Sequence, residues 1–364
     1  MTAEPAPISF ARGAPSLDII DVDGLRRAAE RAFSKDPAGS FAYGTAVGYK
    51  PLRAWIAQRH GVAEDQVLVT NGSMQADAFL FQTLVQAGDG VIVERPSYDR
   101  TLLSLRGREA KVHPVELEAD GVNVRAMAEL LAGGTPVTLA HIIPNFQNPA
   151  GYTLSGEKRR ALVALAREYD FTIFEDDPYV ELRFSGTTEP TMLSLAGGDE
   201  VVYASSFSKT VCPGIRVGYL VGDADLIATI TKLATSTYIS PSMVSQSIVN
   251  EFVRGGSFDS SIETVKTALS QRAKRLSEAL RAELPQVSFV EPEGGYFLWV
   301  QLPEGVDGDA LTEAAAKRGV AVVKGSDFVT DGSRDAIRLA YSGVGLEEIS
   351  EGVTRLAQAF REVA

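Results

Sequence analysis

Cysteine is nearly absent from this chain, and so are the features of exported or membrane-inserted proteins. A single cysteine, Cys212, stands among 364 residues, so no internal disulfide can form. A chain without disulfides suits a reducing compartment, and we expect a cytoplasmic protein. Residues 1–8 lack the basic region and long apolar run of a secretory signal, and no later stretch stays apolar long enough to span a bilayer. We therefore expect no signal peptide and no membrane partner.

Basic residues and histidines are also scarce. The chain has 35 Lys and Arg against 47 Asp and Glu, which gives a net charge of -12. This charge disfavours nucleic acids and anionic membranes as partners, although local arginines can still bind a small anion. The three histidines, His60, His113 and His141, have no ligand-like spacing, and we interpret them as surface or core residues. No metal site is predicted.

What remains is the composition and pattern of a globular α/β protein. Hydrophobic residues make up 45% of the chain and charged residues 23%. The length suits one large α/β domain and a smaller one. Strands alternate with helices from Val67 to Val221, which favours a mainly parallel sheet with helices on both faces. Apolar periodicity and turn signals predict helices at about 22–33, 51–59, 73–85, 155–169, 224–235, 241–253, 257–283 and 346–360.

The stretch from Ser205 to Gly218 carries the chemistry. It joins two apolar runs and contains Lys209, Arg216 and the hydroxyl residues Ser206 and Ser208. A lysine amine forms a Schiff base with an aldehyde only when part of it is deprotonated, so its usual pKa of about 10.4 must be lowered by a cation or a desolvating pocket. Two hydroxyl donors and a forked guanidinium suit a phosphate. A reactive lysine beside a phosphate cup is what pyridoxal 5'-phosphate requires, whereas a surface lysine in a polar loop is the alternative.

This stretch resembles the lysine signature of fold-type-I pyridoxal-phosphate aminotransferases of class I and II. Within them it is most similar to the aminoadipate and aromatic aminotransferases, whose domain also occurs in MocR-type regulators. The resemblance implies a large cofactor-binding domain at 35–255, built on a mainly parallel sheet of the seven-stranded type. It also implies a smaller α/β domain formed by 1–34 together with 256–364. The expected activity is ping-pong transfer of an amino group between an L-amino acid and a 2-oxo acid, in a homodimer.

Two further segments match the family's cofactor contacts. A strand at 67–70 is followed by Gly72, Ser73 and Met74, which open a helix and offer backbone N–H groups to an anion. The resemblance makes these residues the cradle of the cofactor phosphate, although a glycine turn before a helix is common without a ligand. Tyr98 stands where relatives have the aromatic residue that stacks on the pyridine ring. A tyrosine of the core is the alternative.

Two strand ends supply the ring contacts. The predicted strand at 171–174 runs into Asp176, and a carboxylate there can pair with the pyridine nitrogen and make the ring an electron sink. The family places this aspartate three residues before a tyrosine that bonds the ring hydroxyl oxygen, which is the spacing of Asp176 and Tyr179. Asp177, the next residue, is the only other candidate for pairing with the ring nitrogen. Asn148, after the strand at 138–143, matches the family's Asn-Pro-x-Gly turn and the donor to the same oxygen, although turn chemistry alone also explains the motif.

The resemblance also suggests residues for the substrate and for a partner subunit. Arg338 lies in an apolar strand, where a buried arginine needs an anion, and the matching arginine of relatives grips the substrate carboxylate together with Asn148. A water-facing arginine on an edge strand is the alternative. The segment with Arg12 and Gly13 resembles one that folds over the active site, so Arg12 either reaches an acidic substrate or stays in solvent. Tyr43 matches a tyrosine that crosses to the neighbouring subunit's phosphate, with an aromatic turn residue as the alternative.

The implied mechanism has Lys209 as cofactor anchor and proton carrier, with Asp176 and Tyr179 as further catalytic residues. Another reaction of the same cofactor, as in a lyase, decarboxylase or oxidase, is a rival. A non-catalytic ligand-sensing domain like that of the MocR-type regulators is the second rival. The likeness begins near residue 8 without a winged helix before it, and the charge is acidic, so we expect an enzyme. The side chain of the substrate is not readable from the sequence.

Overall fold

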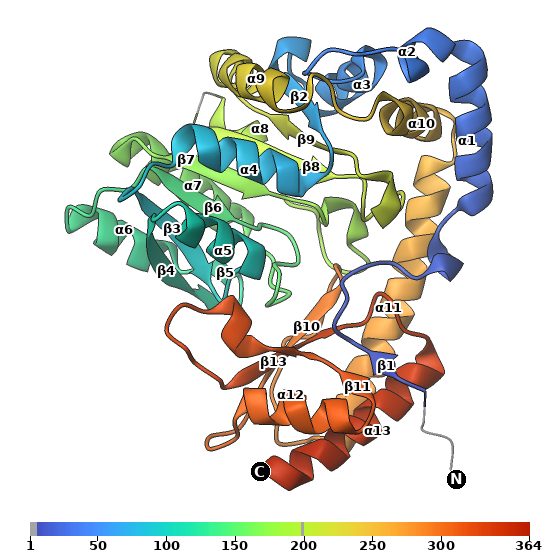
Figure 1. Cartoon of the computed structure of the whole chain (residues 1–364). Helices are drawn as coiled ribbons and strands as arrows, with labels where there is room; N and C mark the ends of the chain where they lie inside the picture. The colour runs from blue at the N-terminus through green and yellow to red at the C-terminus, as the bar shows by residue number, and fades with distance from the viewer. Residues whose placement is uncertain (1–5, 198–199) are drawn as a thin grey trace.

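The computed structural model describes residues 6–197 and 200–364. The part of the signal-peptide expectation that concerns residues 1–5 therefore lies outside the described residues. Within the described ranges, no helix combines the length and the apolar character that a membrane crossing needs. The chain forms a larger part around one sheet and a smaller part below it in Figure 1, with the N-terminal strand beside the C-terminal third of the sequence.

One mixed sheet forms the centre of the larger part. In the described residues it has eight strands in the order β2-β9-β8-β7-β6-β3-β4-β5. They are β2 (Val67–Thr70), β3 (Gly90–Arg95), β4 (Lys111–Glu118), β5 (Gly121–Val122), β6 (Leu139–Ile142), β7 (Thr172–Asp176), β8 (Val201–Ser206) and β9 (Gly218–Val221). The strands from β8 to β4 run parallel, whereas β9 is antiparallel to β2 and β8, and β5 to β4. The predicted mainly parallel sheet is confirmed, and the short β5 adds a strand to the seven expected.

Helices cover both faces of this sheet because successive strand residues point in opposite directions. Val91 and Val93 of β3 face a first layer made by α4 (Ser73–Leu84), α5 (Asp99–Gly107) and α9 (Ala224–Tyr238). Ile92 between them faces the second layer, with α6 (Val124–Ala132), α7 (Gly156–Tyr169) and α8 (Met192–Ala196). On this second face, α3 (Lys50–His60) covers β2, and α1 (Val22–Lys35), α2 (Pro37–Phe41) and α10 (Met243–Arg254) pack next to it.

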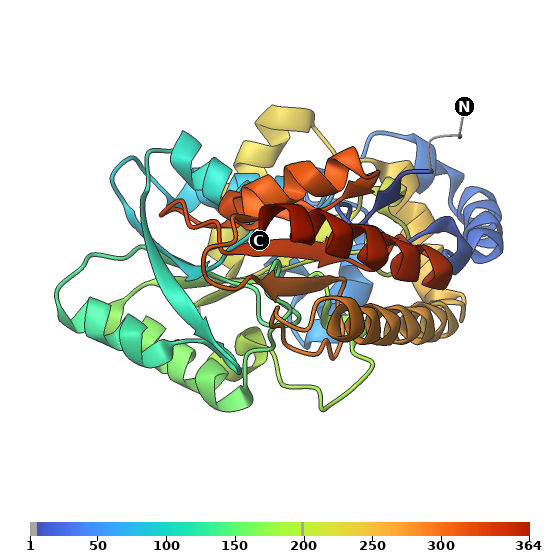
Figure 2. The ribbon, with the colours of Figure 1, turned by 90° about the horizontal axis from the view of Figure 1, so that it is seen from below.

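The smaller part has its own core. Within the described residues, β10 (Phe297–Gln301), β13 (Ala336–Ala340) and β12 (Val323–Lys324) form an antiparallel sheet, with β13 in the middle. Next to it, β1 (Ile8–Ser9) pairs in parallel with β11 (Val320–Ala321). Figure 2 shows α13 (Leu346–Val363) between α12 (Gly308–Lys317) and α11 (Phe258–Glu283), where it buries Ile349, Val353 and Leu356.

Helix α11 links the two cores. Phe258 and Ile262 in its first turns pack with α3 and α10, whereas Leu269 and Leu276 pack in the core of the smaller part. At the other end of the chain, Ile8, Phe10 and Ile19 belong to the smaller core, and α1 then packs along α10 of the larger one. The chain therefore passes between the cores once near residue 20 and once inside α11, and the domain boundaries at 35 and 255 remain a prediction.

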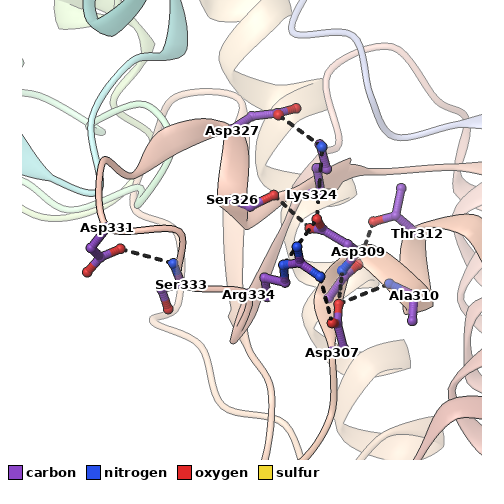
Figure 3. Close-up of polar contacts among 11 residues, drawn as sticks. Asp307, Asp309, Ala310, Thr312, Lys324, Ser326, Asp327, Asp331, Ser333 and Arg334 are labelled. Carbon is purple, nitrogen blue, oxygen red and sulfur yellow. Dashed lines mark hydrogen bonds and ion pairs between the residues drawn. The ribbon is translucent and has the colours of Figure 1, made fainter.

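A braced loop connects β12 to β13. Lys324 Nζ lies 3.5 Å from a carboxylate oxygen of Asp327 and 3.9 Å from one of Asp309, at the start of α12. Ser326 donates to the same Asp309 at 2.7 Å, and Arg334 lies 3.6 Å from it on the other side (Figure 3). These contacts hold the short helix η5 (Gly325–Phe328) against α12.

The same loop contacts the larger part. The carbonyl of Phe328 accepts a hydrogen bond from the backbone N–H of Ser97 at 2.9 Å. Arg95, at the end of β3, donates from Nε to Asp331 at 3.0 Å. The loop thus joins the two parts directly beside Tyr98, one of the predicted site residues.

Candidate active site

A pocket of about 130 Å³ opens at the carboxyl ends of the parallel strands, the edge where open α/β sheets bind ligands. Its walls are Ser73, Met74, Asp77, Tyr98, Ile143, Asn148, Asp176, Pro178, Tyr179, Ser206, Ser208, Lys209 and Arg216. These include every cofactor-binding residue predicted from the sequence except Gly72, which adjoins Ser73, and Tyr43. The topology brings them together because β3, β6, β7 and β8 all end at this edge.

Lys209 follows β8 and turns its amine into the pocket. Its Nζ donates to the carbonyl oxygen of Gly13 at 2.6 Å and lies 5.0 Å from the ring centre of Tyr296. Burial lowers the pKa of Lys209 to about 8, helped by the positive charges of Arg338 and Arg216 and opposed by Asp176. At pH 7 about a tenth of the amine is therefore unprotonated and able to attack an aldehyde.

An anion cup lies beside this lysine. Gly72 begins α4 with a φ of 87°, and a Cβ there would come within 2.1 Å of a guanidinium nitrogen of Arg216. Arg216 itself has a φ of 49°, in the left-handed region, and donates to Ser208 Oγ at 3.2 Å. No side chain caps the start of α4, and of its first three N–H groups only that of Gln75 is used, by the Gly72 carbonyl at 3.1 Å, so those of Ser73 and Met74 remain available. Helix amides, a hydroxyl and a guanidinium together form a phosphate site.

Asp176 is the last residue of β7 and lies at the base of the pocket. Its side chain is buried, Oδ2 lies 3.5 Å from His141 Nε2, and Oδ1 has no hydrogen-bond partner in the described residues. A buried carboxylate oxygen without a donor is unfavourable, and a protonated pyridine nitrogen would supply that donor. The rival Asp177 points away from the pocket and accepts two hydrogen bonds from Asn145, at 2.9 and 3.0 Å.

Arg338 lies on the central strand of the smaller sheet and is only 7% exposed. Its guanidinium sits between the rings of Phe297 and Phe328, at 4.3 and 4.9 Å from their centres. It donates to Asn148 Oδ1 at 3.0 Å and to the carbonyl of Ala11 at 2.8 Å, and Nε has no partner among the described residues. The alternative of a water-facing arginine on an edge strand is therefore wrong. The free Nε–H of the guanidinium can still donate to a substrate carboxylate.

Two of the predicted site residues lie away from the pocket. Tyr43 is 89% exposed, and Arg12 is also exposed. Gly13, the residue after Arg12, reaches the site through its carbonyl, which accepts from Lys209. A role for Tyr43 in this site needs a second subunit, and a role for Arg12 needs a substrate that extends toward it.

Three side chains at the site were missed from the sequence. Tyr296 donates to the backbone carbonyl of Lys209 at 3.0 Å. His141 is a core histidine, as one of the two interpretations had it, but it also faces Asp176 and lies 3.4 Å from Thr101 Oγ1. Asp77 lines the pocket from the second turn of α4. The sequence did hold a clue to Asp77, because a charged residue in a mostly apolar helix is costly to bury and such a position is often functional.

These residues fit pyridoxal 5'-phosphate. The anion cup suits its phosphate, and Tyr98 and Tyr179 line the same pocket with aromatic surfaces and hydroxyls. The unpaired Oδ1 of Asp176 suits a ring N–H, and the amine of Lys209 suits the aldehyde. Each donor or acceptor of the cofactor thus has a counterpart in this pocket.

Comparisons with known proteins agree with this fit. A sequence model described as "Aminotransferase class I and II" matches residues 7–356. An aromatic-amino-acid aminotransferase of Thermococcus litoralis is 33% identical over 98% of this chain and 88% of its own length. The structure of a kynurenine aminotransferase from Pyrococcus horikoshii, 33% identical, superposes with a TM-score of 0.93 over 99% of this chain and 92% of that one.

A second solved structure carries a cofactor-derived ligand. It is an α-aminoadipate aminotransferase from Thermus thermophilus, complexed with N-(5'-phosphopyridoxyl)-L-leucine. It is 30% identical to this chain, with a TM-score of 0.93 over 98% of this chain and 92% of its own. Because these matches span nearly the whole sequence, the chain belongs to the class I and II aminotransferases and is a transaminase that uses pyridoxal phosphate.

Proposed function

We propose that this transaminase holds its cofactor on Lys209 and moves an amino group from an L-amino acid to a 2-oxo acid in two half-reactions. One observation carries the proposal: a lysine with a lowered pKa shares a pocket with an anion cup and an unpaired buried carboxylate oxygen. Bound pyridoxal phosphate supplies an aldehyde carbon for the amine and a ring that takes up electrons from the substrate's α-carbon.

The chain's own residues then have distinct tasks. Lys209 Nζ takes the proton from the substrate's α-carbon and delivers it to the cofactor carbon that carried the aldehyde, as a general base and acid. Asp176 pairs with the ring nitrogen, while the Tyr179 hydroxyl and the Asn148 amide bond the ring hydroxyl oxygen. Tyr98 stacks on the ring. Gly72, Ser73, Met74, Ser206, Ser208 and Arg216 hold the phosphate.

Arg338 and Asn148 bind the substrate carboxylate. The guanidinium is held flat between two aromatic rings, so its fork points in a fixed direction. The named relatives act on aromatic amino acids, kynurenine and α-aminoadipate. We propose the same two classes, aromatic and long acidic amino acids, as the first substrates to test here. If Arg12→Ala leaves the kinetics of glutamate and aminoadipate unchanged, Arg12 is no determinant of acidic substrates.

A homodimer would complete the site. Phe41, Tyr43 and Ile239 are 63%, 89% and 59% exposed, which is unusual for large apolar side chains. They lie on neighbouring segments, because the Tyr238 hydroxyl donates to the carbonyl of Ala46 at 3.2 Å. We propose that a second copy covers them, and that Tyr43 of each subunit reaches the phosphate of the other.

We also propose a cytoplasmic location. Cys212, the single cysteine of the sequence, is free in the structure. A protein stabilised without disulfides suits a reducing compartment. Recovery of the activity in an exported fraction of fractionated cells would contradict this.

Absorption spectroscopy tests the function. The purified protein with pyridoxal phosphate should show a visible band that particular amino acids bleach and a 2-oxo acid restores. Lys209→Ala should lose this band and lower turnover by about a hundredfold or more. Lys274→Ala, a mostly exposed lysine of α11, is the matched control and should behave like the parent. Parent-like turnover in Lys209→Ala would overturn the proposal.

A further inference from the structure

Asp77 is a buried acid to which the proposed mechanism gives no task. It lies in the second turn of α4, on the same helix face as the buried Leu80 and Phe81 one turn further on. It is only 5% exposed, it lines the same pocket as Asp176, and its Oδ1 has no hydrogen-bond partner in the described residues. A buried polar group in this state is costly unless another group uses it.

Asp176 offers the matching acceptor. Its Oδ2 lies near His141, but its Oδ1 is also unpaired among the described residues, in the same pocket. Two carboxyl groups that share a buried site do not both ionise at low cost. Burial, and then the negative charge of Asp176, raise the pKa of Asp77 well above its usual value. Both effects favour the protonated form of Asp77, whose O–H group needs an acceptor.

We propose that Asp77 is a positioning residue for Asp176: as a neutral acid it donates a hydrogen bond to the Asp176 carboxylate and fixes how that carboxylate meets the cofactor's ring nitrogen. The inference rests on the proposed role of Asp176. The pair carries one proton and one negative charge. With His141 on one oxygen and Asp77 beside the other, Asp176 is held from two elements, β6 and α4.

The other ionisable groups around Asp77 are compatible with a neutral acid. Tyr98, on the connection between β3 and α5, faces it, and burial raises the pKa of this tyrosine, so its hydroxyl stays uncharged. Lys209 and Arg216 line the same pocket. His141 stands behind Asp176 on β6, next to Phe81 and Phe174. No cation pairs with Asp77 within the part of the chain that the structure describes.

Two variants of the holoenzyme test whether Asp77 acts as a neutral hydrogen-bond donor or through a negative charge. Asp77→Leu fills the same apolar face but removes the donor, so we expect kcat to fall about tenfold, with a smaller change in KM. Asp77→Asn keeps an uncharged donor of the same shape and should recover most of that loss. Because a neutral group replaces a neutral group, Asp77→Asn should also leave the pH midpoint of the cofactor's visible band in place. If Asp77 were ionised, the same change would lower that midpoint by about one unit or more.

Infrared spectroscopy reads the proton directly and needs no turnover. The difference spectrum between the holoenzyme and Asp77→Asn should contain one carbonyl stretch of a protonated carboxylic acid. Other buried acids such as Glu94 and Asp177, whose pKa values burial raises to about 8, are common to both proteins and cancel in the difference. The Asp77 stretch should change frequency in Asp176→Asn, because the acceptor has lost its charge. This readout also covers the case in which Asp77→Leu does not fold. A difference spectrum without such a band, or a band that Asp176→Asn leaves unshifted, overturns the pairing. Equal kcat losses in the Leu and Asn variants overturn it as well.

The failure of the inference is distinguishable from that of the proposed function. If the unaltered protein forms no visible band with pyridoxal phosphate, the proposed function fails, while the infrared band still reports whether Asp77 is protonated against Asp176. If the visible band forms and responds to amino acids but Asp77→Leu turns over like the parent, only the inference fails.

Discussion

The reactivity of Lys209 depends on charges that come from three separate segments of the chain. Burial and the cations Arg338 and Arg216 lower its pKa to about 8, and Asp176 counteracts them. Only the unprotonated amine attacks an aldehyde. In protein freed of its cofactor, the rate of pyridoxal phosphate capture should therefore rise about tenfold per pH unit below 8 and level off above it.

Variants of the charged neighbours should move this midpoint in opposite directions. Arg338→Met removes a repelling cation and should raise the midpoint, whereas Asp176→Asn removes an attracting charge and should lower it. Stopped-flow absorbance at each pH measures the rate. A midpoint near that of free lysine, about 10.4, in the unaltered protein would show that the pocket does not perturb Lys209.

Individual residues could be predicted where the sequence surrounds them with an unusual pattern. Lys209 stands between hydroxyl residues and an arginine, and Asp176 ends an apolar strand three residues before a tyrosine, so both were found. His141 was not assigned to the site because its relation to Asp176 exists only across the sheet, where β6 lies beside β7. Asp77 lies 99 residues before Asp176 in the sequence, and no local spacing connects them.

The start of α4 and the strand β9 are fitted closely to each other, and this fit shapes the phosphate cup. A Cβ on Gly218 would come within 2.4 Å of the backbone nitrogen of Ser73 and 2.6 Å of the carbonyl carbon of Gly72. Both atoms belong to the backbone, which cannot move aside cheaply. Gly218→Ala should therefore push the helix start out of place and weaken the retention of pyridoxal phosphate about tenfold, measured as the dissociation constant by fluorescence titration.

Gly222→Ala is the matched control for this change. Gly222 directly follows the same strand, and a Cβ there would meet only side-chain atoms of Val202, at an ordinary 3.5 Å. Its cofactor affinity should match that of the parent. If both variants bind the cofactor equally well, the approach of β9 does not shape the cup.

Helices and strands could be predicted where the apolar pattern extends over many residues and where capping or turn residues mark the ends. The strand at 67–70 and the helix expected at 155–169, found as α7, agree with the structure within a residue. The two-residue strands β1 and β11 were not predicted, because so short a segment shows no period and its partner lies some 300 residues away. Helix α12 was also missed, although Asp307 caps it by accepting from the N–H groups of Asp309 and Ala310.

At the scale of the molecule, the pocket is a meeting point of both parts. Its walls include Asp176, the last residue of β7, and Lys209, which follows β8. Arg338 of the smaller sheet donates to the lining residue Asn148, and Gly13 of the N-terminal segment accepts from Lys209. No periodicity predicts that residues 8–13 lie beside residues 320–340; only the family resemblance suggested it. The η5 loop, with Phe328 against Arg338 and Asp331 against Arg95, then ties the substrate anchor to the larger part.

Among the predicted cofactor-binding residues, Tyr43 is the one whose side chain lies in solvent away from the pocket, at 89% exposure. If Tyr43 serves the partner's phosphate, a variant with weakened cofactor binding and an inactive variant should repair each other. In a mixed dimer of Tyr43→Ala and Lys209→Ala, one site receives Lys209 from its own subunit and Tyr43 from its neighbour, while the other site receives neither. We expect Tyr43→Ala alone to weaken cofactor binding about tenfold, through the loss of a hydrogen bond to a charged group.

Random coexpression of the two variants gives mixed dimers in half of the molecules, each with one intact site. At a cofactor concentration that leaves Tyr43→Ala largely unloaded, the mixture should therefore regain about a quarter of the parent activity. Coexpression of Leu346→Ala, an exposed apolar residue of α13, with Lys209→Ala controls for simple dilution. Activity no higher than the average of the two separate variants would mean that Tyr43 acts within its own subunit or outside the site.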